Sequence, residues 1–308
     1  MTNKEALKYA YDKLKETDEP KEAARFLLKQ IVKKDLSFIL AYPETKLSLG
    51  EERKFKRWVK KRSKHLPVWY ITGYEHFCGL DFKVNQDVLI PRPETEILVE
   101  KVLSHTCHPE LVSGSPQLQD RILKQVQDDG KRGSVASGKG LTIADIGTGS
   151  GAIGISLAKN LPKAKVYLTD VSKDALKVAR KNAKLNKVKN VKILQGNLLE
   201  PLPQKVDLIV ANLPYVPSED MSSLSLDILH HEPRIALEGG GDGLDLYREF
   251  FGKAPEKIKK GGKMFVEIGE RQGEKMVKIV KNVFPDAKVT WEKDWAGLDR
   301  FVIVELGE

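Results

Sequence analysis

The chain has 308 residues, of which 41% are hydrophobic and 31% are charged, and its formal net charge is +9. This balance excludes a chain that is disordered throughout, and no stretch approaches the ~20 apolar residues that a membrane-spanning helix needs. Two cysteines, Cys78 and Cys107, cannot form a disulfide framework or a four-thiolate zinc site. The start, MTNKEALKYAYDKLKE, lacks the apolar core of a secretory signal, so we expect a cytoplasmic protein without a bound metal.

Residues 1–68 have the pattern of a small helical bundle. Residues 4–16 are amphipathic. A second helix is expected to start at residues 18–20 (Asp-Glu-Pro), because proline suits the first helical position and acidic side chains suit the positive end of the helix dipole. A third, basic helix is expected to begin near Ser48 and to be stopped by Pro67.

Nearly all of the excess positive charge lies in this helical start, where residues 1–65 hold 18 Lys and Arg against 10 Asp and Glu. The densest run comprises Arg53, Lys54, Lys56, Arg57, Lys60, Lys61, Arg62 and Lys64. Such a patch would raise the encounter rate with an acidic or nucleic-acid-containing partner. A solvated helix face is an equally good interpretation of a charge run alone.

Residues 69–90 are predicted to form a β-hairpin linker, because residues 74–77 and 80–84 alternate like strands around a Cys78-Gly79 turn. The run VLIPRPETE at 88–96 is extended and fixed by its prolines, and it leads into a helix that ends near Leu103.

Residues 104–140 are expected to be a surface insertion, because they are rich in Ser, Gly, Gln and Asp and carry no sustained period. His105, Cys107 and His108 fall within this segment. Three candidate ligands packed so closely, without a second cluster in the sequence, do not indicate a metal site.

A regular alternation of strands and helices follows, so residues 91–308 are predicted to form one α/β domain with a largely parallel sheet covered on both faces. The last helix is followed by two strands, so the sheet is expected to end in an antiparallel hairpin. The predicted strands are 142–146, 165–169, 191–195, 206–211, 263–268, 287–291 and 300–306, and the predicted helices are 151–160, 173–186, 244–259 and 270–283.

A glycine-rich loop, GTGSGAIG at 147–154, joins the first of these strands to a helix. Its glycines allow a sharp turn and the close approach of a ligand at the positive end of the helix. The second strand ends at Asp170, whose carboxylate can accept both ribose hydroxyls of an adenosine. Together these features predict an adenosine-containing cofactor, and they leave NAD and S-adenosylmethionine open. The loop by itself could be a simple strand-to-helix turn.

The fourth strand, 206–211, is almost wholly apolar and ends in Asn212-Leu213-Pro214-Tyr215. In a doubly wound sheet this turn lies beside the glycine loop. The side-chain carbonyl of Asn212 and the backbone carbonyl of Leu213 are acceptors suited to holding a planar –NH2 group. They would orient a poorly nucleophilic nitrogen and stabilise positive charge as a methyl group arrives. The other interpretation is a plain Asx-Pro turn.

These motifs together resemble the release factor glutamine methyltransferases, the HemK/PrmC group. The resemblance is close over about 69–103 and 141–306 and loose over the helical start. The matching runs are WYITG (69–73), VLIPRPETE (88–96), DIGTGSGAI (145–153), ANLPY (211–215), HEPRIAL (231–237), GLDLYR (243–248) and KDWAGLDR (293–300).

The resemblance implies a class I methyltransferase (Rossmann-like) fold with a seven-stranded sheet. It also implies an enzyme that uses S-adenosyl-L-methionine to methylate the side-chain amide nitrogen of the glutamine in the Gly-Gly-Gln loop of class-1 peptide-chain release factors. The helical start would then dock the release factor. We expect a monomer with no membrane and no direct nucleic-acid substrate. The implied cofactor-binding residues are Gly147, Thr148, Gly149, Ser150, Gly151, Asp170, Leu198 and Asn212, and the implied catalytic residues are Asn212, Leu213, Pro214 and Tyr215.

Three features depart from the family pattern. Leu213 replaces the first proline of the usual Asn-Pro-Pro-Tyr turn, so we expect a less rigid turn whose backbone carbonyl is retained. Asn197 stands where a carboxylate is common, and the 104–140 insertion has no recognised counterpart.

Three alternatives therefore stay open: an amino methyltransferase acting on nucleic-acid adenine or on another protein amide, a dehydrogenase, and a catalytically decayed module that binds a release factor or the ribosome. A dehydrogenase would give no role to the turn at 212–215.

Overall fold

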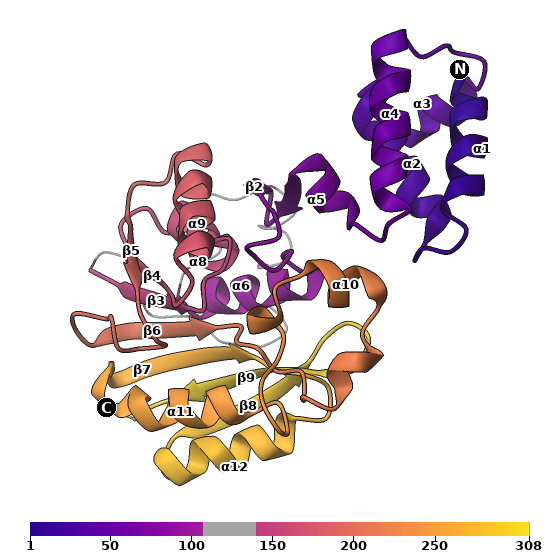
Figure 1. The fold of residues 1–308 in the computed structure, drawn as a ribbon. Coiled ribbons are helices and arrows are strands. Elements are labelled where there is room, and N and C mark those ends of the chain that lie inside the picture. Colours follow the sequence, from indigo (N-terminus) through magenta and orange to yellow (C-terminus); the bar gives the residue numbers. More distant parts are fainter. Residues whose placement is uncertain (107–139, 308) are drawn as a thin grey trace. The chain divides into compact units, whose positions relative to one another are not determined.

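The computed structural model describes residues 1–106 and 140–307, and these fall into two units (Figure 1). One unit comprises residues 1–74 together with 222–232, and the other comprises residues 75–221 together with 233–308. Within the described part of the chain, no helix has the length and apolar character to cross a membrane.

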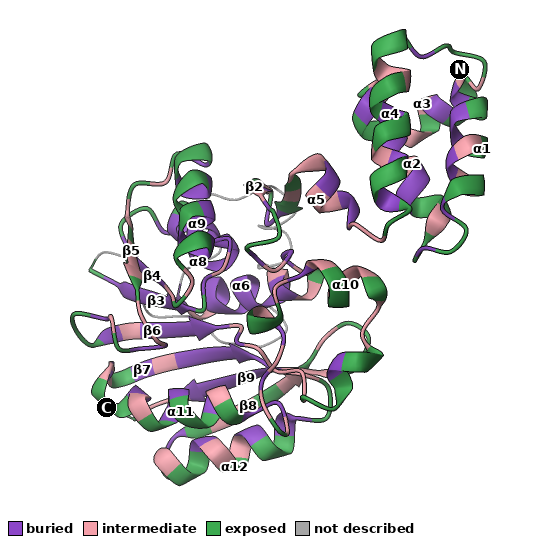
Figure 2. Cartoon of the chain, viewed as in Figure 1, coloured by how far each residue is buried: buried purple, intermediate pink, exposed green. Residues whose placement is uncertain are grey.

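Short helices make up the first unit, and all of them except α10 (Leu226–His231), which has no buried residue, contribute to its apolar core (Figure 2). The others are α1 (Asn3–Lys13), α2 (Pro20–Val32), α3 (Leu36–Ala41), α4 (Leu49–Arg62) and α5 (Val68–Thr72). Capping boxes start α1, where Thr2 pairs with Glu5, and α4, where Ser48 pairs with Glu51. The three helices expected from the sequence are confirmed, although α4 ends well before Pro67. The short helices α3 and α5 were not predicted, because so few residues carry too little hydrophobic period.

The basic run at 53–64, in α4 and the two residues after it, is largely, but not wholly, a solvated surface. Seven of its eight cationic residues are exposed, and the exception is Arg62, whose side chain is only 3% exposed. The Arg62 guanidinium forms an ion pair with Asp227 at 2.6 Å and donates to the backbone carbonyl of Asp18. Arg62 therefore serves the packing of this unit, and the remaining seven cations form the exposed basic face.

A seven-stranded sheet forms the centre of the second unit, in the order β5-β4-β3-β6-β7-β9-β8. All neighbouring pairs are parallel except those of β9, which runs antiparallel to both β7 and β8. The predicted α/β sheet with a terminal antiparallel hairpin is thus confirmed, with β9 inserted between β7 and β8. The strands are β3 (Thr142–Ile146), β4 (Lys165–Asp170), β5 (Val191–Gln195), β6 (Val206–Ala211), β7 (Ile258–Glu267), β8 (Lys288–Lys293) and β9 (Asp299–Glu305).

Helices cover both faces of this sheet, because its central strands are apolar on both sides (Figures 1 and 2). One core cluster joins strand residues such as Ile143 to α6 (Pro93–Thr106), α8 (Ala152–Asn160) and α9 (Lys173–Leu185). The opposite cluster joins residues such as Ala144 to α11 (Asp245–Lys253) and α12 (Gly273–Val283). Successive residues of β3 therefore anchor opposite layers, which holds the carboxyl ends of the strands in place.

The predicted helix at 244–259 was too long. The α-helix α11 ends at Lys253, a 3-10 turn covers Ala254–Glu256, and β7 already begins at Ile258. Pro255 explains the early end, because proline clashes with the preceding helical turn and has no N–H to donate. The early start of β7 was hidden by Gly261-Gly262, which interrupts the apolar pattern where the pairing with β6 shifts register.

The predicted hairpin is present as β1 (Tyr74–Phe77) and β2 (Leu80–Lys83). The side chain of Asn182 on α9 ties β2 to the sheet unit, since it accepts from the Lys83 N–H at 2.7 Å and donates to the Lys83 carbonyl at 3.0 Å. Most of the predicted 104–140 insertion, including Cys107 and His108, lies outside the described residues. Its first three residues continue α6, which extends beyond the predicted end at Leu103.

Replacing Gly154 by alanine is expected to destabilise the sheet unit by about 3 kcal/mol, because overpacking a tight core is costly. A Cβ at Gly154 would lie 2.0 Å from Cδ2 of Leu168 and 2.9 Å from a carboxylate oxygen of Asp145. Gly252→Ala is the matched control, since it meets no atom within 4 Å. This control should be neutral or stabilising by about 0.5 kcal/mol. Equal midpoints of urea unfolding for the two variants would contradict the expectation.

Candidate functional site

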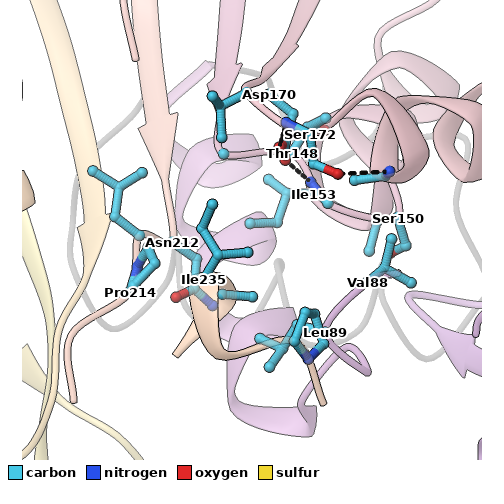
Figure 3. A pocket seen from close by; sticks show the side chains of 18 of the residues that line it. Val88, Leu89, Thr148, Ser150, Ile153, Asp170, Ser172, Asn212, Pro214 and Ile235 are labelled. Atoms are coloured by element: carbon cyan, nitrogen blue, oxygen red, sulfur yellow. Dashed lines mark hydrogen bonds between the residues drawn. The ribbon is translucent and has the colours of Figure 1, made fainter. Parts of the chain in front are cut away.

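The carboxyl ends of three adjacent strands, β4, β3 and β6, meet at one edge of the sheet and form the floor of a pocket of about 320 Å³ (Figure 3). Of the predicted site residues, Gly147, Thr148, Gly149, Ser150, Asp170, Leu198, Asn212, Leu213 and Pro214 line it, whereas Gly151 and Tyr215 do not. Figure 3 shows Asn212 and Pro214 on one side of the pocket and Ser150 and Ser172 on the other.

The glycine loop after β3 approaches the turn after β6 closely. Gly147 has a φ of +69°, and a Cβ there would lie 2.9 Å from Cδ2 of Leu213 and 3.9 Å from the backbone carbonyl of Asn212. Gly149 also has a positive φ, and nothing occupies the space where its Cβ would be. Gly151 is the N-cap of α8 and is buried. The loop is therefore shaped for close approach to its neighbours and to a ligand.

A buried carboxyl group in β3 holds this loop in shape. Oδ2 of Asp145 accepts from the Thr148 hydroxyl at 2.5 Å and from the Gly154 N–H at 2.9 Å, so it ties both ends of the loop to the strand. Burial raises the pKa of Asp145 to about 6. The Asp145 carboxyl group therefore holds the loop through bonds within the protein, without a contribution from a ligand.

Asp170, at the end of β4, has a more structural environment than the sequence suggested. Its two carboxylate oxygens accept from the backbone N–H groups of Gly149, at 2.9 Å, and of Ser172, at 2.8 Å. Burial raises the pKa of Asp170. Each carboxylate oxygen keeps a second lone pair, and the side chain lines the pocket, so it can also accept from ligand hydroxyls.

Asn197, which stands where the family commonly has a carboxylate, forms a hydrogen bond with a neighbouring side chain. Its side-chain amide donates to Glu249 of α11 at 2.7 Å, and both Asn197 and Leu198 line the pocket. The Leu198 carbonyl accepts from the hydroxyl of Thr169, which fixes the loop after β5 against the end of β4. This side of the pocket therefore combines an apolar surface with a side-chain amide.

The turn at 212–215 is held by hydrogen bonds along its length. The Asn212 amide donates to Thr95 Oγ1 at 3.3 Å, and the Leu213 N–H donates to the Tyr247 hydroxyl at 3.1 Å. The Tyr215 carbonyl accepts from Gln272 at 3.0 Å. The bond made by Leu213 is one that proline could not make, so the turn has support despite the departure from the usual proline.

Tyr215 itself packs against the apolar cluster on the α11 face instead of lining the pocket. Burial, together with the charge of Glu267, raises the pKa of its phenol, and the guanidinium of Arg300 opposes that shift. Its phenol ring therefore belongs to the packing of the sheet unit, whereas the other three residues of the turn line the pocket.

Part of the pocket wall was not predicted from the sequence, and it comes from the segment that leads into the first turn of α6 and from the segment after α10. The additional lining residues include Asp87, Val88, Leu89, Pro91, Arg92, Thr95, Pro233, Ile235 and Ala236. Apart from Asp87, these residues belong to the runs VLIPRPETE (88–96) and HEPRIAL (231–237), which resemble the family but carry no residue that was predicted for the site.

Tyr247→Phe is expected to lower the free energy of unfolding by about 2 kcal/mol, because it leaves the buried Leu213 N–H without its partner. The same hydroxyl also donates to the backbone carbonyl of Glu267. Tyr167→Phe is the matched control. Tyr167 is equally buried, but its hydroxyl has no hydrogen-bond partner in the described part of the chain, so its removal should be neutral or stabilising. Chemical denaturation of both variants checks this, and equal losses would refute it.

Comparison with known proteins gives consistent matches along the chain. Residues 5–73 match the family described as PrmC N-terminal domain, and residues 133–244 match the Methyltransferase small domain family. A release factor glutamine methyltransferase from Bacillus cereus is 36% identical over 305 residues, with 98% of each chain covered. One from Bacillus subtilis is 38% identical over 304 residues, covering 97% of this chain and 96% of its own. Among solved structures, a protein-(glutamine-N5) methyltransferase (release factor-specific) from Alicyclobacillus acidocaldarius is similar over 74% of this chain and 100% of its own, with 23% identity and a TM-score of 0.39.

Proposed function

The chain belongs to the release factor glutamine methyltransferases, and from this we propose that its pocket binds S-adenosyl-L-methionine and that the turn at 212–215 holds the glutamine side chain of a class-1 peptide-chain release factor. The reaction would place a methyl group on the side-chain amide nitrogen of the glutamine in the Gly-Gly-Gln loop. The observation that carries the proposal is the 2.9 Å approach between the Gly147 Cβ position and Leu213, which brings the glycine loop against the turn.

The residues of the pocket fit this cofactor. Gly149 leaves room for close approach, the carboxylate of Asp170 offers acceptors for two ribose hydroxyls, and Leu198 offers an apolar surface for an adenine ring. When bound, the cofactor supplies an electrophilic methyl carbon on a sulfonium. The protein's own groups have to orient the substrate nitrogen and stabilise the charge that develops on it.

We propose that Asn212 and Leu213 promote methyl transfer mainly by orienting the substrate amide. An amide nitrogen is a poor nucleophile because its lone pair is delocalised into the carbonyl. Two acceptors, Oδ1 of Asn212 and the Leu213 carbonyl, would fix the direction of the –NH2 group and stabilise the positive charge that develops on nitrogen. The methylated nitrogen is then strongly acidic, so its proton can leave to water without a dedicated base.

The helical unit is proposed to dock the release factor. Its exposed basic face, formed by six cations of α4 and by Lys64 just after it, supports this proposal because long-range attraction speeds the encounter with an acidic partner. We propose that the enzyme acts as a monomer in the cytoplasm, where translation termination takes place.

Incubation with tritiated S-adenosyl-L-methionine and a purified class-1 release factor tests the function. We expect label on the glutamine of the Gly-Gly-Gln loop, located by mass mapping, and none on a release factor in which that glutamine is alanine. Transfer of label to DNA or RNA instead, or to another residue of the release factor, would overturn the proposal.

A further inference from the structure

A hydrogen-bonded chain runs from the interior of the sheet unit to the pocket. Thr95, in the first turn of α6, donates from Oγ1 to Oε2 of Glu267 at 2.7 Å and accepts from Nδ2 of Asn212 at 3.3 Å. Glu267 is the last residue of β7 and is 1% exposed, and Thr95 is 4% exposed. Three elements distant in sequence therefore contribute one residue each to a single relay.

The chemistry of the relay fixes its direction. An ionised carboxylate can only accept, so the single hydroxyl proton of Thr95 points to Glu267. The remaining lone pairs of that hydroxyl can then only accept, which turns the –NH2 end of the Asn212 side chain toward Thr95. Oδ1 of Asn212 is thereby left for the pocket, which the side chain lines.

We propose that Thr95 and Glu267 are positioning residues that hold Asn212 with its side-chain carbonyl, and not its –NH2 group, toward the substrate amide. This inference rests on the proposed function of Asn212. If Glu267 were neutral, Thr95 could donate to Asn212 instead, and the amide could rotate by half a turn. Its –NH2 group would then face the substrate –NH2 group, and two donors cannot bond to one another.

The relay makes the activity pH-dependent. Burial raises the pKa of Glu267 to about 7. The groups that face it are Thr95 and Glu94 of α6, Arg300 of β9, the turn residues Asn212 and Tyr215, and Tyr247 of α11. Because the ionised form is the orienting one, kcat/KM should rise as pH increases through about 7 and level off above it. The folded state, in contrast, loses stability as pH rises through this pKa, because a raised carboxyl pKa favours the protonated group.

Three variants separate orientation from packing. Thr95→Val keeps the shape and loses the hydroxyl, Thr95→Ser keeps the hydroxyl, and Glu267→Gln keeps the size and loses the charge. We expect Thr95→Val and Glu267→Gln to lower kcat by about tenfold or more, with the Kd for S-adenosyl-L-methionine within about twofold of the parent value. Thr95→Ser should retain most of the parent kcat. Glu267→Gln should also lose the rise of kcat/KM near neutral pH, while resisting denaturant at pH 8 at least as well as the parent.

A readout that does not require turnover accompanies these rates. The side-chain amide resonances of Asn212, assigned by comparison with Asn212→Ala, should show slow proton exchange in the parent protein and faster exchange in Thr95→Val. The inference is wrong if Thr95→Val keeps the parent kcat, if Thr95→Ser falls as far as Thr95→Val, or if Asn212 exchange is the same in parent and Thr95→Val. If the parent protein fails to label the release factor while the exchange difference is present, the relay stands and the proposed substrate is wrong.

Discussion

Replacing Asn212 with alanine is expected to lower kcat at least about a hundredfold, because it removes an oriented acceptor from the charge that develops on the substrate nitrogen. The cofactor should still bind, since the glycine loop and Asp170 are untouched and the loop is held by Asp145. We therefore expect a Kd for S-adenosyl-L-methionine within about threefold of the parent value. Single-turnover methyl transfer to a release factor measures the rate, and calorimetry measures the Kd for S-adenosyl-L-methionine.

Asn197→Ala is the matched control for this prediction. Asn197 also lines the pocket, but it lies on the other side, where its amide bonds to Glu249. Its loss is expected to act on the cofactor Kd and to leave kcat nearly unchanged at saturating cofactor. A parent-like rate in Asn212→Ala, or an equal loss of rate in Asn197→Ala, would show that the acceptor role has been assigned to the wrong residue.

The Asp170→Ala variant is expected to bind S-adenosyl-L-methionine at least about thirtyfold more weakly, because a hydrogen bond to a charged group contributes about 1.5–3 kcal/mol. The loss has two sources. The variant lacks the acceptors for the ribose, and it leaves the N–H groups of Gly149 and Ser172 without their carboxylate. Calorimetric titration gives the Kd directly.

The Asp170→Asn variant separates the loss of the ribose acceptors from the loss of support for the two backbone N–H groups. It keeps one side-chain oxygen, so we expect an intermediate Kd between the parent value and that of Asp170→Ala. Asp174→Ala is the outer control, because Asp174 is an exposed residue of α9 that pairs only with Lys177 within the described residues. A parent-like Kd in Asp170→Ala would place the cofactor elsewhere and would also remove the basis of the proposed function.

The strands and their order along the chain could be predicted from the sequence because nearly continuous apolar runs such as 206–211 are typical of strands buried on both faces. The boundary errors have a physical cause. Apolar residues continue the period of α11 past Pro255, but the ring of that proline and its missing N–H end the helix. The short helices α3 and α5 depend on packing within their unit, which single-sequence periodicity does not report.

The residues that follow neighbouring strands could be placed together from the sequence. The strands β4, β3 and β6 bring Asp170, the glycine loop and Asn212 to one edge of the sheet. The relay could not be predicted, because Thr95 and Glu267 are 172 positions apart and contact each other only through the packing of α6 on β7. The place of Tyr215 could not be predicted either, because only the fold shows that its ring packs against the apolar cluster on the α11 face.

The double attachment of Asp145 to Thr148 and Gly154 has one more consequence. A loop that its own strand already holds rigid has little conformational freedom to lose on association, so most of the ordering entropy must come from the small molecule itself. Recognition should then follow a lock-and-key course: the backbone amide resonances of the loop should show little microsecond-to-millisecond exchange broadening before titration and no new slow phase during it.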